Sequence, residues 1–552
     1  MIWLRVLALL LIGAPVLAGA GMTLLTALGW QPAFGRTGLS LAGFEQALAV
    51  PGLWTSLRLT LVTGIGASVL SLAVSIPIAR WVVSRGRGAG WLAPWLAVPH
   101  AALAIGLAFL LAPSGWIARM LAPLAGWEVP PAFVTVGDPA GVALILGLML
   151  KEVPFLVLVT LAAAAQQPVA AQMAAGRSLG YSPARVWARG IWPVLYPSLR
   201  LPIFIVLAFS LSVVDVALVL GPGHPPTLAV LILRRFADPD PAQAVVASAL
   251  AVGLLAVMAG LVLLWFLAER VIARFGADVI ARGTRGRLRG GLDARVPMGL
   301  GAMLGLGAFG ALALWSLARR WPFPSILPES WSLARWAEGA WLAPAAETLG
   351  LGAAAVALSL LLAVVWLETE DRSGTRAGLG AVIVLPLLLP QIGFLQGLTS
   401  SFIWLGLPPG RLAVLWALSL FVFPYVMIAL AGPWRALDPA QIRSAASLGA
   451  GPGRRLWAVK LPILLRPLMV AAAVGFAVAA AQYLAVLLPG AGRVRVLATE
   501  AVALSSGADR RIAAVQALAL AALPLVAYAL ALGLPAWLYR DRAGLRGGGH
   551  GA

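Results

Sequence analysis

Ionisable and strongly polar side chains within long apolar segments are the residues of this chain that could do chemistry. There are seven of them: His100, Lys151, Glu152, Asp215, Gln391, Gln482 and Tyr483. A charged side chain at the centre of a membrane helix costs about 2.5–3.5 kcal/mol on insertion scales, and it usually marks a functional path or a paired charge. We therefore expect these side chains to face the interior of a helix bundle and to line the path of a solute.

The two charges at Lys151 and Glu152 are adjacent, so on a helix they point about 100° apart and cannot both face one partner. We expect one of them to face the bundle interior, and Asp215 either to neutralise Lys151 or to line the path. A purely structural ion pair that locks two helices together remains an alternative. For His100 and Gln391, each directly after a proline, and for Gln482 and Tyr483, the alternative is a helix–helix hydrogen bond.

The composition excludes several classes of protein. The chain has 552 residues, of which 61% are hydrophobic and 11% charged, whereas soluble domains carry roughly 25% charged residues. It has no cysteine and three histidines, which excludes thiolate chemistry and disfavours a histidine-based metal centre. No phosphate-binding loop of the G-x-x-x-x-G-K-[ST] type is present, so the chain is not expected to hydrolyse ATP by itself.

Apolar runs of about 20 residues, the length that spans a bilayer, predict an all-α integral membrane protein. Twelve are expected, at about 6–29, 57–79, 91–112, 141–164, 201–221, 245–268, 296–318, 346–367, 378–402, 412–432, 468–489 and 512–537. The net charge of +20 resides almost entirely in arginines of the short loops. This pattern orients a membrane protein, with both termini in the cytoplasm, rather than binding nucleic acid.

One polar, basic loop occurs twice, at Ala174–Pro193 and Arg443–Pro462, at an offset of 269 residues. Both copies share a Ser-Leu-Gly followed by matching proline and arginine positions. Glycine and proline predict a helix–turn–helix in each copy, because Gly ends a helix and Pro begins one. The residues of this frame are Leu179, Gly180, Ser182, Pro183 and Arg185 in the first copy and Leu448, Gly449, Gly451, Pro452 and Arg454 in the second.

This loop resembles the EAA loop of ABC importer permeases, which reads E-A-A-x-x-x-G, then about nine residues, then I-x-L-P. The stretch from Ala436 to Gly449 is especially similar. Both copies depart from the family at the first, acidic position, where Ala174 and Arg443 stand. The departure puts in doubt the ion pair that the usual glutamate makes, but the glycine and proline frame is retained.

The resemblance implies a type I importer architecture of two parallel six-helix repeats. It assigns residues 1–270 to the first repeat with its loop at about 166–200, and 271–295 to an arginine-rich linker. Residues 296–540 form the second repeat with its loop at about 435–467, and 541–552 a cytoplasmic tail. It also implies a bacterial inner-membrane location, a cytoplasmic ATPase dimer that holds ATP and Mg²⁺, and a periplasmic substrate-binding protein. The permease itself binds no cofactor.

Fused halves, together with Lys151-Glu152-Val153-Pro154-Phe155 and Leu220-Gly221-Pro222-Gly223, resemble thiamine permeases first and iron(III) permeases second. Polyamines and oxyanions remain open as cargo. Two other functions compete with an importer subunit. A twelve-span secondary transporter would use a coupling carboxylate such as Asp215, but it leaves the duplicated loop unexplained. A membrane enzyme would need clustered acids, bases or metal ligands, and the 20 acidic residues and three histidines are scattered.

Overall fold

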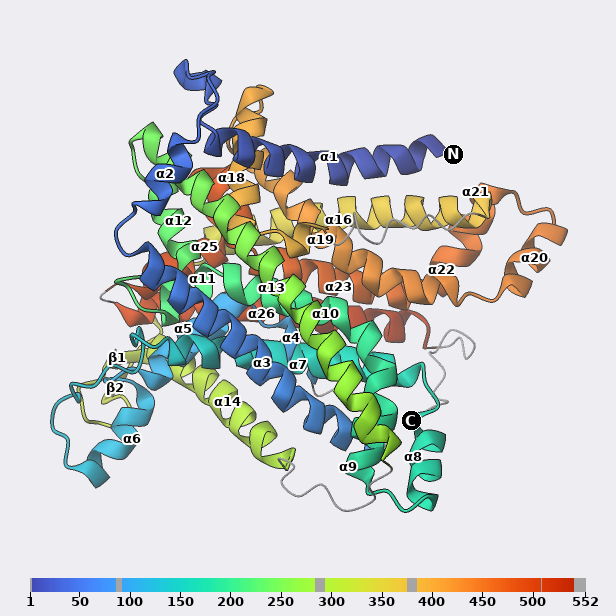
Figure 1. Ribbon diagram of the computed structural model, residues 1–552, viewed down its shortest axis with the longest axis horizontal. Helices are drawn as coiled ribbons and strands as arrows, with labels where there is room; N and C mark the ends of the chain where they lie inside the picture. Colours follow the sequence, from blue (N-terminus) through green and yellow to red (C-terminus); the bar gives the residue numbers. More distant parts are fainter. Residues whose placement is uncertain (1, 86–91, 283–292, 375–384, 508, 541–552) are drawn as a thin grey trace.

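The computed structural model describes residues 2–85, 92–282, 293–374, 385–507 and 509–540. It is a bundle of long helices (Figure 1), with a small two-stranded antiparallel sheet in one outer loop. The helices of the first half are α1 (Ile2–Ala27), α2 (Ala42–Leu48), α3 (Leu53–Arg85), α4 (Ala93–Ala97), α5 (His100–Leu111), α6 (Trp116–Ala125), α7 (Val142–Ala165), α8 (Val169–Ser178), α9 (Pro183–Val186), α10 (Trp192–Ser212), α11 (Asp215–Leu220), α12 (Leu228–Phe236) and α13 (Pro241–Ala281).

The second half repeats this order with few changes. Its elements are α14 (Arg295–Leu317), β1 (Ala318–Arg320), β2 (Ser330–Trp331), α15 (Ala334–Ala337), α16 (Leu342–Ser373), α18 (Gln391–Trp404), α19 (Arg411–Arg435), α20 (Pro439–Ser447), α21 (Pro452–Arg455), α22 (Leu461–Ile463), α23 (Leu465–Ala481), α24 (Leu484–Gly490), α25 (Leu497–Ser505) and α26 (Arg510–Leu538). A π-helical turn follows α9 at Trp187–Ile191 and α21 at Leu456–Lys460.

Ten helices among the described residues are long and apolar enough to cross a membrane, and the bent pair Pro452–Ile463 with Leu465–Ala481 makes eleven. We expected twelve. The difference is the ninth expected span, 378–402, because residues 375–384 lie outside the described part and the helix that follows, α18, has 14 residues. The predicted linker also differs at its start, since α13 continues as a helix to Ala281. The expected tail, 541–552, lies outside the described residues.

The internal repeat is visible in single hydrogen bonds. Thr60 of α3 accepts the amide of Leu228, the first residue of α12, at 2.8 Å, and Thr348 of α16 accepts the amide of Leu497, the first residue of α25, at 3.0 Å. The two threonines are buried, and each satisfies an amide at a helix start that has no partner within its own helix. The pairs place α3 opposite α16 and α12 opposite α25.

The first helix of each half packs against the other half. Helix α1 lies along α18, and α14 lies along α5. Glycines make this close approach possible: a Cβ at Gly397 would lie 2.0 Å from the carbonyl oxygen of Gly19, and one at Gly106 would lie 2.8 Å from that of Ala308. The hydroxyl of Thr23 donates to the carbonyl of Gly393 at 2.8 Å across the α1–α18 contact. Small residues and polar cross-links of this kind drive helix association in lipid.

Both duplicated loops lie at the same end of the bundle (Figure 1). Helices α8 and α9 project from one part of that end, and α20 and α21 from another, while α2, α6, α12 and the small sheet lie at the opposite end. The hydroxyl of Tyr539, just after α26, donates to the carbonyl of Pro462 at 3.1 Å, so the end of α26 reaches the second loop.

Candidate functional site

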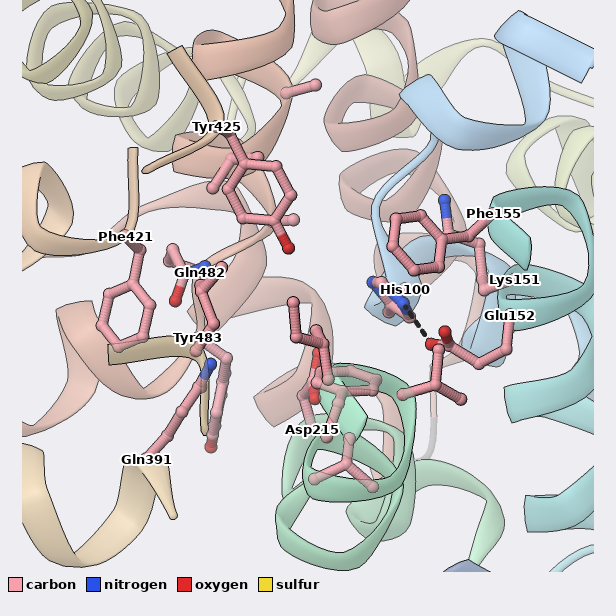
Figure 2. Close-up of a pocket in the computed structure, with 18 of the residues that line it drawn as sticks. His100, Lys151, Glu152, Phe155, Asp215, Gln391, Phe421, Tyr425, Gln482 and Tyr483 are labelled. Carbon is pink, nitrogen blue, oxygen red and sulfur yellow. Dashed lines mark ion pairs between the residues drawn. The ribbon is translucent and has the colours of Figure 1, made fainter. Parts of the chain in front are cut away.

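A cavity of about 300 Å³ lies between the two halves, and all seven polar residues singled out from the sequence line it. Figure 2 shows His100, Lys151, Glu152 and Asp215 of the first half on one side of it, facing Gln391 and Gln482 of the second half. Tyr483 also belongs to this lining. The structure therefore brings together, from six broken or proline-containing helices, residues that are far apart in the sequence.

Breaks in the helices bring these side chains to the cavity. Pro99 and Pro390 precede the first residues of α5 and α18, which are His100 and Gln391. A proline has no amide to donate, so a helix starts there without losing a hydrogen bond. The link between α10 and α11 and the link between α23 and α24 form two further breaks.

The breaks correct one pairing expected from the sequence. Asp215 and Gln482 each precede a proline by seven residues, but Asp215 is the first residue of α11, and the first residue of α24 is Leu484. The helix ends therefore place Val213 opposite Gln482. Asp215 is a carboxylate that the first half alone carries at this break.

Lys151 has a different partner from the one expected. Its ammonium group donates to the carbonyl oxygens of Trp95 at 2.8 Å, Leu96 at 3.1 Å and Val98 at 2.5 Å. These carbonyls are left without helical partners where α4 ends, and they use all three donors of the lysine. Among the residues that the structure describes, no ion pair joins Lys151 to Asp215. The lysine thus holds the break between α4 and α5.

Both carboxylates of the cavity are buried, with 6% of Glu152 and 8% of Asp215 exposed. The Glu152 carboxylate lies 3.6 Å from Nε2 of His100 (Figure 2), and the His100 ring packs against Phe209 with centroids 4.7 Å apart. Because Lys151 is bound to carbonyls, neither carboxylate has that ammonium as a partner. The side of the cavity formed by the first half therefore presents acidic oxygens.

Aromatic side chains complete the lining, and the sequence reasoning missed them. Tyr425, Phe155, Phe421 and Tyr528 all line the cavity. A signal was available for two of them, because Phe155 and Tyr425 directly follow Pro154 and Pro424, prolines that occupy matching positions in the two halves. Buried carboxylates beside aromatic faces form an environment that suits an organic cation.

The duplicated loops have the expected helix–turn–helix geometry. Gly180 and Gly449 have φ values of +83° and +81°, a left-handed conformation that glycine adopts without steric cost. The short helices α9 and α21 begin at Pro183 and Pro452, as expected, and Ser182 occupies the residue before α9 without donating or accepting a capping hydrogen bond.

The loops also expose apolar and basic side chains at matching positions. Leu179 is 60% exposed and Leu448 is 87% exposed, each directly before the left-handed glycine. Arg185 and Arg454 occupy the third position of α9 and α21. A large apolar residue exposed at the same point of both loops is typical of a contact surface for another protein.

No protein-family model matches the chain. Comparison with curated proteins finds similarity to the molybdenum transport system permease protein ModB of Azotobacter vinelandii, 31% identical over 163 residues, which cover 26% of this chain and 72% of that protein. It also finds the inner membrane ABC transporter permease protein YnjC of Escherichia coli (strain K12), 33% identical over 513 residues, which cover 92% of this chain and 93% of that protein.

Among the described residues, no group of three or more His, Cys, Asp or Glu side chains could hold a metal ion. Membership of the YnjC-like family implies an ATPase and a binding protein as partners, and no cofactor on the permease. The full-length similarity, the bundle of long apolar helices and the paired loops lead to one assignment: the chain belongs to the ABC transporter permeases, as a multi-pass inner-membrane subunit that is not itself the ATPase.

Proposed function

We propose that this permease imports a small organic cation of the thiamine type, with iron(III) as the second candidate. A periplasmic binding protein delivers the cation, and a cytoplasmic ATPase dimer drives alternating access. The bundle end that carries both loops faces the cytoplasm, together with both termini. The cavity between the halves is the translocation path.

The observation that carries the choice of cargo is the chemistry of the cavity. Glu152 and Asp215 place two buried carboxylates in it, and Tyr425, Tyr483 and Tyr528 contribute aromatic rings. An organic cation gains from both kinds of group, through charge attraction and through cation–π contact. An oxyanion would face two carboxylates. For iron(III), the described residues offer no cluster of three ligands, so a path-bound ion would have to arrive within a chelate.

Transport in proteoliposomes tests the cargo. The chain is reconstituted with its ATPase and binding protein, and uptake of radiolabelled thiamine, an iron(III) chelate and molybdate is compared. We expect ATP-dependent uptake of the cation, lowered by Glu152→Gln and Asp215→Asn. Uptake of the chelate or of molybdate alone would refute the proposed cargo, and uptake on an ion gradient without ATP would favour a secondary transporter.

The proposed role of the loops is that α9 and α21 act as coupling helices, each bound in a cleft of an ATPase subunit. Leu179, Gly180, Ser182, Pro183 and Arg185 would form the first contact. The equivalent residues in the second are Leu448, Gly449, Gly451, Pro452 and Arg454.

Co-purification tests that role. Valine at both Gly180 and Gly449 cannot adopt the left-handed conformation without strain. We expect the double variant to lose the ATPase subunit, whereas Gly432→Val, at a glycine with open space around it and no positive φ, retains it. Retention of the ATPase by the double variant would refute the assignment.

A further inference from the structure

A cluster of charged side chains connects the end of α16 to the second loop. Lys460, the last residue of the π-helical turn after α21, donates to Oε2 of Glu368 at 2.6 Å and to Oδ2 of Asp371 at 2.5 Å. Trp434, near the end of α19, donates its indole N–H to the same Asp371 oxygen at 3.0 Å. The helix after the loop and the helix before it are thus both attached to α16.

Two arginines extend this attachment. Arg435, the last residue of α19, lies 3.0 Å from Oε2 of Glu370. Arg372 bonds Glu368 at 2.6 Å and also donates to the carbonyl of Pro452, the first residue of α21, at 3.4 Å. The second loop is therefore held at its start, at its short helix and at its end. We call Glu368, Glu370, Asp371, Arg372, Arg435 and Lys460 the charge clamp.

Burial makes the clamp directional and stiff. Only 5% of Lys460 and 7% each of Glu368 and Glu370 are exposed. Exposed ion pairs contribute little because water screens them. Removing one partner of a buried pair leaves a desolvated charge, which is strongly unfavourable. Charged hydrogen bonds also fix distance and angle, whereas apolar contacts have no preferred direction.

The first half has no such clamp at the equivalent positions. There, Arg80 replaces Glu368, Val82 replaces Glu370 and Ile191 replaces Lys460, by the offsets that match α3 to α16 and α9 to α21. Val82 and Ile191 are buried in an apolar cluster that also contains Val186 and Trp187. The first loop therefore rests on apolar packing.

Polar atoms near the first loop add a second, independent contrast. Among the described residues, Trp81 Nε1, Gln172 Oε1, Ser182 Oγ and Trp187 Nε1 are buried without a hydrogen-bond partner. Around the second loop, the tryptophan and carboxylate groups of the clamp are bonded to one another. Directional contacts hold the second loop, and mostly non-directional contacts hold the first.

We infer that the charge clamp makes the two coupling loops mechanically unequal: the second moves as one body with α16 and α19, whereas the first can shift on its apolar contacts, and Lys460 is the positioning residue of the second. The inference rests on the proposed role of the loops as ATPase contacts. Closure of the ATPase dimer would then act on the bundle mainly through α16 and α19.

Spin-label distances test the stiffness directly, because the chain contains no cysteine and needs no background substitutions. One label pair joins Ser444 of α20 to Ala357 of α16, and its matched pair joins Ala175 of α8 to Val69 of α3. All four positions are exposed, and they correspond between the halves. The full chain is measured in nanodiscs, alone and with its ATPase.

We expect the second-half pair to give the narrower distance distribution. Lys460→Met broadens that distribution and leaves the first-half pair unchanged, and Lys460→Arg, which keeps the charge, restores it. Arg411→Gln is the control, since it breaks an exposed pair with Glu347 elsewhere in the molecule and changes neither distribution. An unchanged second-half distribution in Lys460→Met, or equal broadening of both pairs, overturns the inference.

Coupling is the functional readout. In the assembled transporter, Lys460→Met is expected to lower the stimulation of ATP hydrolysis by the loaded binding protein roughly tenfold, with the basal rate retained. If that variant does not fold, Asp371→Asn removes a more exposed partner and should give a smaller effect of the same kind. An ATPase that fails to bind the wild-type permease refutes the proposed function. Binding with normal stimulation in these variants refutes only the clamp.

Discussion

The contact between α1 and α18 gives the sharpest stability prediction. A Cβ at Gly397 would lie 2.0 Å from the carbonyl oxygen of Gly19 and 2.3 Å from the hydroxyl of Thr23, whereas real Cβ atoms essentially never approach closer than 3.0 Å. The obstacle at Gly19 is backbone, which cannot rotate out of the way. Gly397→Ala must therefore push the two helices about 1 Å apart.

The cost can be estimated from its parts. Overpacking a tight interior costs about 1–3 kcal/mol, and the hydrogen bond from Thr23 to Gly393 contributes about 0.6 kcal/mol if it follows the average in membrane proteins. Alanine regains about 1 kcal/mol of helix propensity over glycine. We expect Gly397→Ala to lower the free energy of unfolding by about 1–3 kcal/mol.

Unfolding by SDS titration, followed by tryptophan fluorescence, measures this loss. Gly21→Ala is the matched control, because Gly21 lies in α1 with nothing within 4 Å of the added Cβ, and it should be neutral or stabilising. Gly106→Ala, whose Cβ would lie 2.8 Å from the Ala308 carbonyl, should fall between the two. Equal stability of the Gly397 and Gly21 variants would refute the close-packing argument.

Three further predictions concern single side chains. Lys151→Met leaves buried carbonyls without a donor, which costs about 1–3 kcal/mol in the same titration; lost transport at unchanged stability would contradict this. The hydrogen bond from Arg511 lowers the pKa of Asp509 below its usual 3.8, so its stabilisation is present above pH 3.8 and is lost as pH falls through the lower folded value. Asp509→Asn should flatten that acid loss in thermal unfolding, and an unchanged pH profile would count against it. Arg119→Met removes hydrogen bonds to the carbonyls of Trp321, Pro322 and Ser325, so amide exchange should rise there and not in α5.

The sequence predicted the parts of this molecule that depend on local chemistry. Glycine and proline determined the shape of both loops, because a left-handed residue and a helix start have few alternatives. Prolines and polar residues inside apolar runs likewise pointed to the cavity. The roles of the seven path residues and of the loop residues remain predictions, since their positions in the fold do not test transport.

What the sequence could not predict depends on contacts between distant segments. Lys151 has backbone carbonyls as partners, and no residue type marks a carbonyl that a broken helix leaves free. The acidic stretch at Glu368–Arg372 contradicted the expected charge pattern of its side. Its explanation needed Arg435 and Lys460, which follow it by more than 60 residues.

The exchange of first helices between the halves has a consequence for biosynthesis. Helix α1 leaves the ribosome first, yet the surface it covers, on α18, is not made until the chain has grown by more than 360 residues. Until then its glycine-lined face meets only lipid or a chaperone. The amino-terminal helix is thus among the earliest segments to enter the membrane and among the last to find its neighbour, which makes the newborn first half dependent on the translation of the second.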